Sequence, residues 1–147
     1  MKYQIKKFND GQITAKIIEN GNIDIKIRGN SYEDLFKAAS IKEAWDAKNL
    51  LNKNVLATLT ICCLIGQRSD RRFNKSESFD LKVISNFINM MKFDKVFILH
   101  PHSETSLALI NNSEKISHFN FVEKAYKIIG KPVLVSIPSL TTSPASA

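Results

Sequence analysis

One stretch of the sequence gathers side chains that can bind phosphate: residues 66–73, Gly-Gln-Arg-Ser-Asp-Arg-Arg-Phe. Three arginines surround a single aspartate there. Guanidinium groups bind phosphate oxygens through paired hydrogen bonds, and a neighbouring carboxylate can orient them. The stretch follows an apolar run that indicates a buried strand, and α/β proteins bind ligands at the carboxyl ends of strands. We interpret it as a phosphate-binding loop, with a solvated basic loop or a nucleic-acid contact patch as the alternatives.

Two histidines, His100 and His102, follow the next predicted strand. A neutral imidazole in this place can bind a divalent metal that accompanies a nucleotide, with phosphates and water filling most of the coordination sphere. Magnesium prefers oxygen ligands, however, and a histidine at the end of a strand is commonly a turn residue. Both interpretations stay open at this point.

A third candidate lies near the start of the chain, where Phe8 precedes Asn9, Asp10, Gly11 and Gln12. The Asn-Asp-Gly sequence is typical of a turn. An exposed phenylalanine beside carboxylate and amide groups can stack on a purine while those groups bind its ring nitrogens. The alternative is that the phenylalanine anchors the segment in the core.

Hydrophobic periodicity predicts the elements that must position these residues. Residues 12–19 and 22–28 both alternate apolar and polar side chains. Asn20 and Gly21 between them easily adopt the positive φ angles of a tight turn. We therefore predict that the two segments pair as a β-hairpin.

The rest of the chain predicts helices alternating with strands. The expected helices are Ser31 to about Leu51, Leu81 to Met91, and Phe119 to Ile128 with a cap at Gly130. The expected strands are Val55 to Cys63, Lys95 to Leu99, and Pro132 to Ile137. Ser31 followed by Asp34 resembles a capping box at the start of the first helix. The apolar run of the first strand predicts cover on both faces, as in an α/β fold with a mostly parallel sheet flanked by helices.

Composition limits the classes of function. The 147 residues suffice for one domain, and 44% apolar with 24% charged residues is typical of a soluble globular protein. The net charge of +7 favours an anionic partner such as nucleic acid, an acidic membrane or a phosphorylated small molecule. No apolar stretch is long enough to span a membrane. Cys62 and Cys63 are adjacent, which predicts neither a disulfide framework nor a metal knuckle, so we expect a cytoplasmic protein.

The order and spacing of these segments resemble the N-terminal half of ribose-phosphate diphosphokinase, also called phosphoribosyl pyrophosphate synthetase. The resemblance runs from about Lys6 to Ser136, and its most specific parts are the arginine-rich stretch and the His-Pro-His strand end. It implies a phosphoribosyltransferase-like fold. It also implies a transferase of nucleotide biosynthesis, a kinase that moves the β,γ-diphosphoryl group of MgATP to the C1 hydroxyl of ribose 5-phosphate. Metal and cations would position and neutralise the phosphates.

The resemblance assigns Phe8, Asp10 and Gln12, with Gly11 between them, to the adenine side of ATP. In such families these contacts cross a subunit boundary. The resemblance therefore implies that the chain forms a homo-oligomer or binds a partner chain.

The other roles implied by the resemblance lie at the two strand ends. Arg68, Ser69, Asp70 and Arg71 would hold the nucleotide phosphates and ribose, and His102 matches a magnesium-associated histidine. The expected cofactor is Mg²⁺, bound together with ATP. No residue is assigned a catalytic role.

The chain departs from the family pattern at three positions and in its last residues. Gln12 stands where glutamate is common, Ser69 where glutamine is common, and His100 where aspartate is common. A typical member continues into a second metal-associated aspartate, a catalytic basic loop and a ribose-phosphate loop. We expect residues 1–138 to form a synthetase-like N-terminal domain and residues 139–147 to be a disordered or truncated tail. Ribose 5-phosphate would bind only if the missing half is supplied.

Two further functions remain as alternatives. The first is a non-catalytic, nucleotide-binding regulatory subunit of the same enzyme. The second is a small basic nucleic-acid-binding protein, which the net charge permits. It ranks last because the sequence has neither a recognition-helix pattern nor a basic strand interleaved with aromatic residues.

Overall fold

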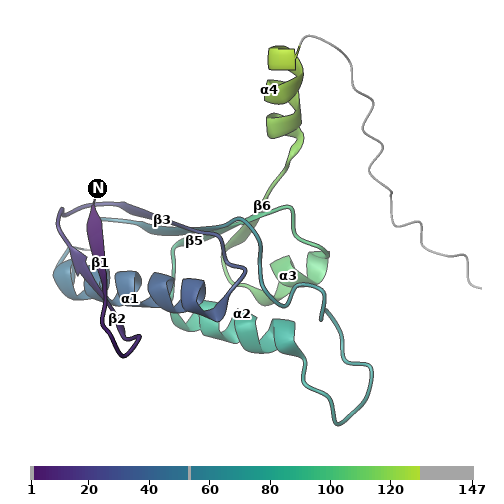
Figure 1. The fold of residues 1–147 in the computed structure, drawn as a ribbon, viewed down its shortest axis with the longest axis horizontal. Helices are drawn as coiled ribbons and strands as arrows, with labels where there is room; N and C mark the ends of the chain where they lie inside the picture. Colours follow the sequence, from purple (N-terminus) through teal and green to yellow (C-terminus); the bar gives the residue numbers. More distant parts are fainter. Residues whose placement is uncertain (1, 53, 130–147) are drawn as a thin grey trace, which may run out of the picture. The chain divides into compact units, whose positions relative to one another are not determined.

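The computed structural model describes residues 2–52 and 54–129 (Figure 1). They form two units, one that extends to Ser117 and one that begins at His118. The predicted strand Pro132 to Ile137, the cap at Gly130 and the tail 139–147 lie outside the described residues.

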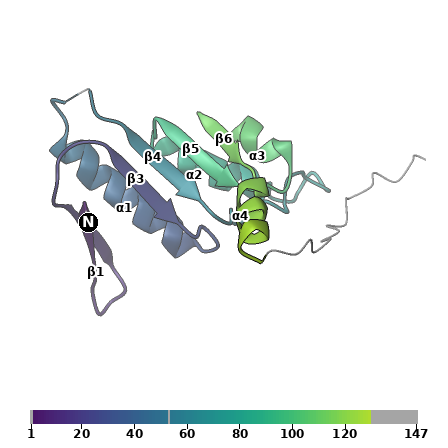
Figure 2. The same ribbon diagram turned by 90° about the horizontal axis from the view of Figure 1, so that it is seen from above.

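A four-stranded parallel sheet is the centre of the first unit, with strand order β3-β4-β5-β6. Its strands are β3 (Ile23–Ile27), β4 (Ala57–Ile61), β5 (Lys95–Leu99) and β6 (Ser113–Ile116). The connecting helices are α1 (Tyr32–Lys48), α2 (Asp80–Met90) and α3 (Glu104–Leu109). Each connection leads to the next strand in the same direction, and right-handed crossovers of this kind place their helices on one face. Figures 1 and 2 show α1 and α2 along the same face of the sheet.

The core lies between this face and the helices. In β3, Ile23, Ile25 and Ile27 are buried, whereas Asp24 and Lys26 between them are exposed. The same alternation occurs in β4, where Ala57, Leu59 and Ile61 are buried and the two threonines between them are only partly buried. Within this unit β4 is therefore covered by helices on one face, and the prediction of two covered faces is corrected. The threonines interrupt the apolar run at alternate positions, which is the pattern of a strand with one covered face.

An antiparallel hairpin precedes the sheet, formed by β1 (Tyr3–Lys7) and β2 (Ile13–Ile17). Ile13 and Ile17 of β2 are buried, whereas β1 is largely exposed. The predicted N-terminal hairpin is therefore present, and the α/β class with a parallel sheet is confirmed.

The predicted pairing within that hairpin is wrong. Segments 12–19 and 22–28 contain β2 and β3, which belong to different sheets. The turn at Gly21, with φ of +104°, leads the chain from the hairpin into the parallel sheet. The hairpin turn is instead the one around Gly11, where φ is +89° and the Phe8 N–H donates to the Gln12 carbonyl at 2.8 Å. Both sequences favour a turn, and neither specifies which strands pair.

Helix α1 agrees closely with its prediction. The Ser31 hydroxyl caps the helix by accepting a hydrogen bond from the Asp34 N–H at 3.1 Å. Leu35, Ile41 and Trp45 are buried on its inner side. Helix α2 and strand β5 also lie where periodicity predicted them.

Two short elements, α3 and β6, were not predicted. β6 has only four residues, Ser-Glu-Lys-Ile, and none of them is fully buried. An edge strand of this kind carries no hydrophobic period to detect. The second unit contains α4 (Phe119–Ile129), which matches the predicted helix and has exposed apolar side chains.

Candidate functional site

The carboxyl ends of β3, β4 and β5 meet at one edge of the parallel sheet. The Cys63 N–H donates to the Arg28 carbonyl at 2.7 Å, and the Ile65 N–H donates to the Gly29 carbonyl at 2.8 Å. The His100 N–H donates to the Ile116 carbonyl at 3.1 Å. The segments that follow β3 and β4 are therefore fixed side by side, and the segment that follows β5 is fixed to the end of β6.

The arginine loop, residues 66–73, begins with a tight turn. Gly66 has a φ of +76°, and a Cβ added there would collide with the Cδ1 atom of Ile84 in α2. The Ser69 N–H donates to the Gly66 carbonyl at 2.9 Å, which closes the turn. Glycine is favoured by this positive φ, and an added Cβ would also require the end of the Ile84 side chain to shift.

Two guanidinium groups of the arginine loop are available to a ligand. Arg68, Arg71 and Arg72 are exposed, and Asp70 keeps only 23% of its side chain accessible. The Arg71 Nε lies 3.8 Å from a carboxylate oxygen of Asp70, and its guanidinium lies 5.5 Å from the ring centre of Phe73. Within the described part of the chain, Arg68 and Arg72 form no hydrogen bond or ion pair. Such unpaired guanidinium groups can take a phosphate without first losing a partner.

The histidine loop, residues 100–103, lies against the arginine loop. The His102 N–H donates to the Gln67 side-chain oxygen at 3.2 Å, although the two residues are 35 positions apart. His100 has a left-handed backbone with φ of +49°, and Pro101 beside it is buried. His102 is exposed. The structure therefore brings together the two strand-end segments that the sequence singled out.

The described residues do not build a metal site by themselves. Among them, no group of three or more histidine, cysteine, aspartate or glutamate side chains is placed to hold a metal ion. Mg²⁺ needs mostly oxygen ligands, and it commonly takes them from substrate phosphates and water. The donor set at this edge therefore fits magnesium only as part of a metal–phosphate complex, with His102 as the neighbouring protein group.

The hairpin loop, residues 8–12, is shaped by Asp10. The carboxylate of Asp10 accepts a hydrogen bond from the Gln12 N–H at 2.9 Å, and both residues are exposed. Phe8 is 40% exposed, with the Lys6 ammonium 4.6 Å from its ring centre. The alternative of a core anchor is therefore wrong for Phe8, whose ring is accessible to solvent.

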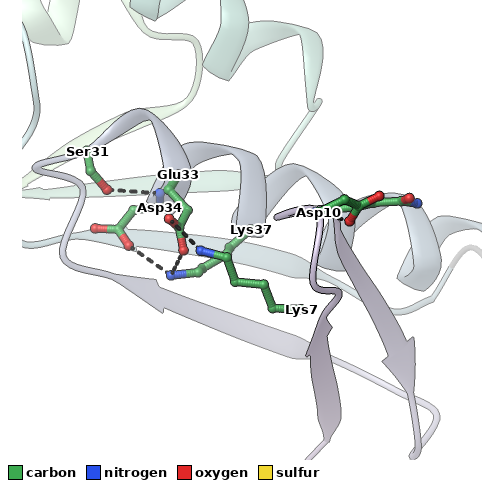
Figure 3. Close-up of polar contacts among 7 residues, drawn as sticks. Lys7, Asp10, Ser31, Glu33, Asp34 and Lys37 are labelled. Atoms are coloured by element: carbon green, nitrogen blue, oxygen red, sulfur yellow. Dashed lines mark hydrogen bonds and ion pairs between the residues drawn. The ribbon is translucent and has the colours of Figure 1, made fainter.

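The hairpin is tied to α1 by an ion-pair cluster. The Glu33 carboxylate lies 3.2 Å from the Lys7 ammonium and 3.0 Å from the Lys37 ammonium. Hydrogen bonds from Lys37, and then from Lys7, lower the pKa of Glu33, and the same pairing raises the pKa of Lys37. Figure 3 shows this cluster on α1, with Asp10 apart from it at the turn.

The hairpin loop and the arginine loop do not meet within one chain. Figures 1 and 2 show the β1–β2 turn and the connection between β4 and α2 well apart in both views. Among the described residues, no hydrogen bond or ion pair joins the two loops.

A cavity of about 510 Å³ beside the hairpin is lined mainly by apolar side chains, including Tyr32, Phe36 and Phe87. It offers no group that binds phosphate.

Two residues at the sheet edge were not among the predicted site residues. Arg28 ends the β3 segment next to Cys63 and is exposed, so it adds a second strand end with a positive charge beside that of β4. The sequence did not predict its place at this edge, because the alternating pattern of segment 22–28 indicated a hairpin strand and not a strand of the parallel sheet. Gln67 stood in the arginine-rich stretch, but no local pattern indicates a contact 35 residues away.

Together, the parallel sheet, its helices and the N-terminal hairpin form an α/β fold that is also found in a solved enzyme structure. Among solved structures, this chain is similar to phosphoribosylpyrophosphate synthetase from Mycobacterium smegmatis, with a TM-score of 0.67 and 12% sequence identity. The match covers 84% of this chain and 44% of that one, so the chain spans less than half of the neighbour's length. No protein-family model matches the sequence, and no curated protein matches it. In the described part of the chain, no helix is both long and apolar enough to cross a membrane.

Proposed function

We propose that this chain binds the phosphates of MgATP at the carboxyl edge of its parallel sheet, as a domain similar to the N-terminal half of ribose-phosphate diphosphokinase. The observation that carries the proposal is the meeting of the arginine loop and the histidine loop beside exposed, unpaired guanidinium groups. The fold of the solved synthetase supports it independently.

Each residue of the proposed site has a distinct task. Two exposed guanidinium groups bind phosphate oxygens: that of Arg68, which is unpaired, and that of Arg71, which lies beside Asp70. Ser69 and Asp70 bind the ribose and orient the arginines. His102 accompanies the magnesium ion, whose charge neutralises the phosphates.

The hairpin loop is proposed to serve the nucleotide of another subunit. Phe8 is exposed and can stack on adenine, while Asp10, Gly11 and Gln12 present a carboxylate and amide groups next to it. The separation of this loop from the arginine loop supports the proposal, because one chain alone does not bring the two together. A homo-oligomer or a partner chain would complete the site.

Diphosphoryl transfer to ribose 5-phosphate is proposed only where another chain or segment holds that acceptor. In-line transfer needs both substrates in position, and the residues assigned here serve the nucleotide. We expect the purified 147-residue chain to release no AMP in the presence of ribose 5-phosphate. Robust turnover by this chain alone would contradict that expectation. Nucleotide binding without turnover would also suit a regulatory subunit.

The decisive test is titration calorimetry with ATP, with and without Mg²⁺, on the wild type and on Arg68→Ala. Loss of a charge-assisted phosphate contact should weaken binding by about 1.5–3 kcal/mol, while the fold stays intact because Arg68 is exposed. Lys95→Ala is the matched control, since it removes a positive charge at the opposite end of β5.

Two results would contradict the proposal. One is the absence of ATP binding to the wild type at millimolar concentration. The other is an unchanged ATP affinity in folded Arg68→Ala. If Arg68→Ala instead weakens DNA binding equally across sequences and reduces its salt dependence, the arginine loop binds nucleic acid.

A further inference from the structure

Gln67 makes the contact that joins the two loops of the proposed nucleotide site. Its side-chain oxygen accepts the backbone N–H of His102 at 3.2 Å. The residue is half-buried between the end of β4 and the arginines that follow it. Gln67 therefore joins the two loops, although it is neither charged nor fully exposed.

The arginine loop has few other anchors. Its hydrogen bonds at Gly66 and Ser69 stay within the turn, and the contact of Arg71 with Asp70 stays within the loop. Residues 71–78 are all exposed. Among the described contacts, the Gln67 bond to His102 is the one hydrogen bond from residues 66–79 to a distant part of the chain.

The histidine loop is held more firmly. The His100 N–H donates to the Ile116 carbonyl at 3.1 Å, and Pro101 is buried. A hydrogen bond from a fixed segment to a weakly anchored one restricts the weakly anchored segment. The Gln67 side chain thus aligns the exposed arginines with the end of β5.

We propose that Gln67 is a positioning residue that makes the arginine loop and the histidine loop a single binding surface for a polyphosphate. The inference rests on the proposed function and deepens it, because it explains how cations on one strand end and His102 on the next reach the same ligand. The ligand class is a nucleoside triphosphate or another compound with at least two linked phosphates. A single phosphate would need only the arginine loop.

Nitrogen-15 NMR spectra of the chain, recorded during titration with ATP in the presence of Mg²⁺, test this proposal. In the wild type, ATP should shift the amide signals of the arginine loop and also that of His102. Gln67→Met keeps the length of the side chain but removes the amide acceptor. In this variant ATP should still shift the arginine loop, the shift at His102 should disappear, and affinity should fall about three- to tenfold.

Gln4→Met is the matched control, since it makes the same exchange at an exposed position of β1. It should behave as the wild type. Gln67→Asn keeps the amide but is one methylene too short to reach His102, so it should reproduce the effect of Gln67→Met. This second variant serves as the test if methionine disturbs the loop.

The outcomes separate the two proposals. If the wild type binds ATP but the folded Gln67 variants keep both the affinity and the His102 shift, the positioning role is wrong and nucleotide binding stands. If ATP shifts no signal in the wild type at millimolar concentration, the proposed function itself is wrong. Equal losses in the Gln4 and Gln67 variants would also contradict a specific role for Gln67.

Discussion

Two connections leave the same edge of the sheet but differ in length, in charge and in how their polar groups are satisfied. The β3–α1 connection is short, and its polar groups satisfy one another: Ser31 caps α1, and the Asp34 carboxylate accepts the Gly29 N–H at 3.2 Å. The β4–α2 connection is long and basic, and Phe79 at the start of α2 provides no side-chain cap. The first connection has a structural role in the fold, whereas the second is the one that we propose binds a ligand.

The largest expected effect on stability comes from Gly29 in the β3–α1 connection. Its φ is +80°, and an added Cβ would collide with the Ile61 side chain and lie 3.0 Å from the Cys63 carbonyl oxygen. Gly29→Ala should therefore reduce the free energy of unfolding by about 2–4 kcal/mol, through backbone strain and overpacking. Urea denaturation measures this change.

Gly21→Ala separates the two causes. Gly21 also has a positive φ, of +104°, but no atom lies within 4 Å of its added Cβ. This variant should cost only about 1 kcal/mol, from backbone strain alone. Equal costs at the two glycines would show that the β3–α1 connection is not tightly packed against β4.

Removal of the α1 cap should have a smaller effect. Ser31→Ala leaves the Asp34 N–H without its acceptor and should cost about 1 kcal/mol of stability. ATP affinity should stay unchanged, because the β3–α1 connection is not part of the proposed nucleotide site. Ser78→Ala is the control next to α2, where the hydroxyl bonds to the Asp80 side chain and caps no helix N–H. If Ser31→Ala weakens ATP binding in the folded protein, the division between the two connections is wrong.

The smallest expected effect concerns the ion pairs that tie the hairpin to α1. Hydrogen bonds from Lys37 and Lys7 lower the pKa of Glu33 below its ordinary value of 4.5, so its ionised form stabilises the fold above that pH. This contribution is lost as the pH falls through the lowered pKa. The melting temperature of Glu33→Gln should lie slightly below that of the wild type at pH 7, and the two should converge as the pH falls through the lowered pKa of Glu33.

Salt provides the control for this cluster. The Lys7 and Glu33 side chains are about half exposed, so added salt should screen their attraction at pH 7 and reduce the difference between the two proteins. A difference that persists unchanged at pH 3 and at high salt would show that Glu33 acts through packing instead of charge.

Local signals predicted much of this fold. Ser31, Asp34 and the apolar spacing after them specify α1, and the largely apolar run from Val55 specifies β4 as a strand, although not the number of its covered faces. The arginine loop was placed correctly because a loop after such a strand must lie at the carboxyl edge. These inferences need only residues close together in the sequence.

Pairing between distant segments could not be read in the same way. The turns at Gly11 and Gly21 look alike in sequence, yet only the first joins paired strands. The second leads into β3, whose partner β4 begins more than thirty residues later, at Ala57. The contact of Gln67 with His102 is equally distant, so the sequence identified both loops without showing that they touch.

The strand order of the sheet also bears on how the protein is made. β3, β4, β5 and β6 lie side by side in the order in which a ribosome synthesises them. Each emerging strand therefore finds its neighbour already present, and no earlier pair has to open to admit it. The Gln67 side chain must wait for His102, 35 residues later, and the arginine loop acquires its distant anchor only after β5 has joined the sheet. During synthesis the arginine loop therefore stays without this anchor until β5 has left the ribosome.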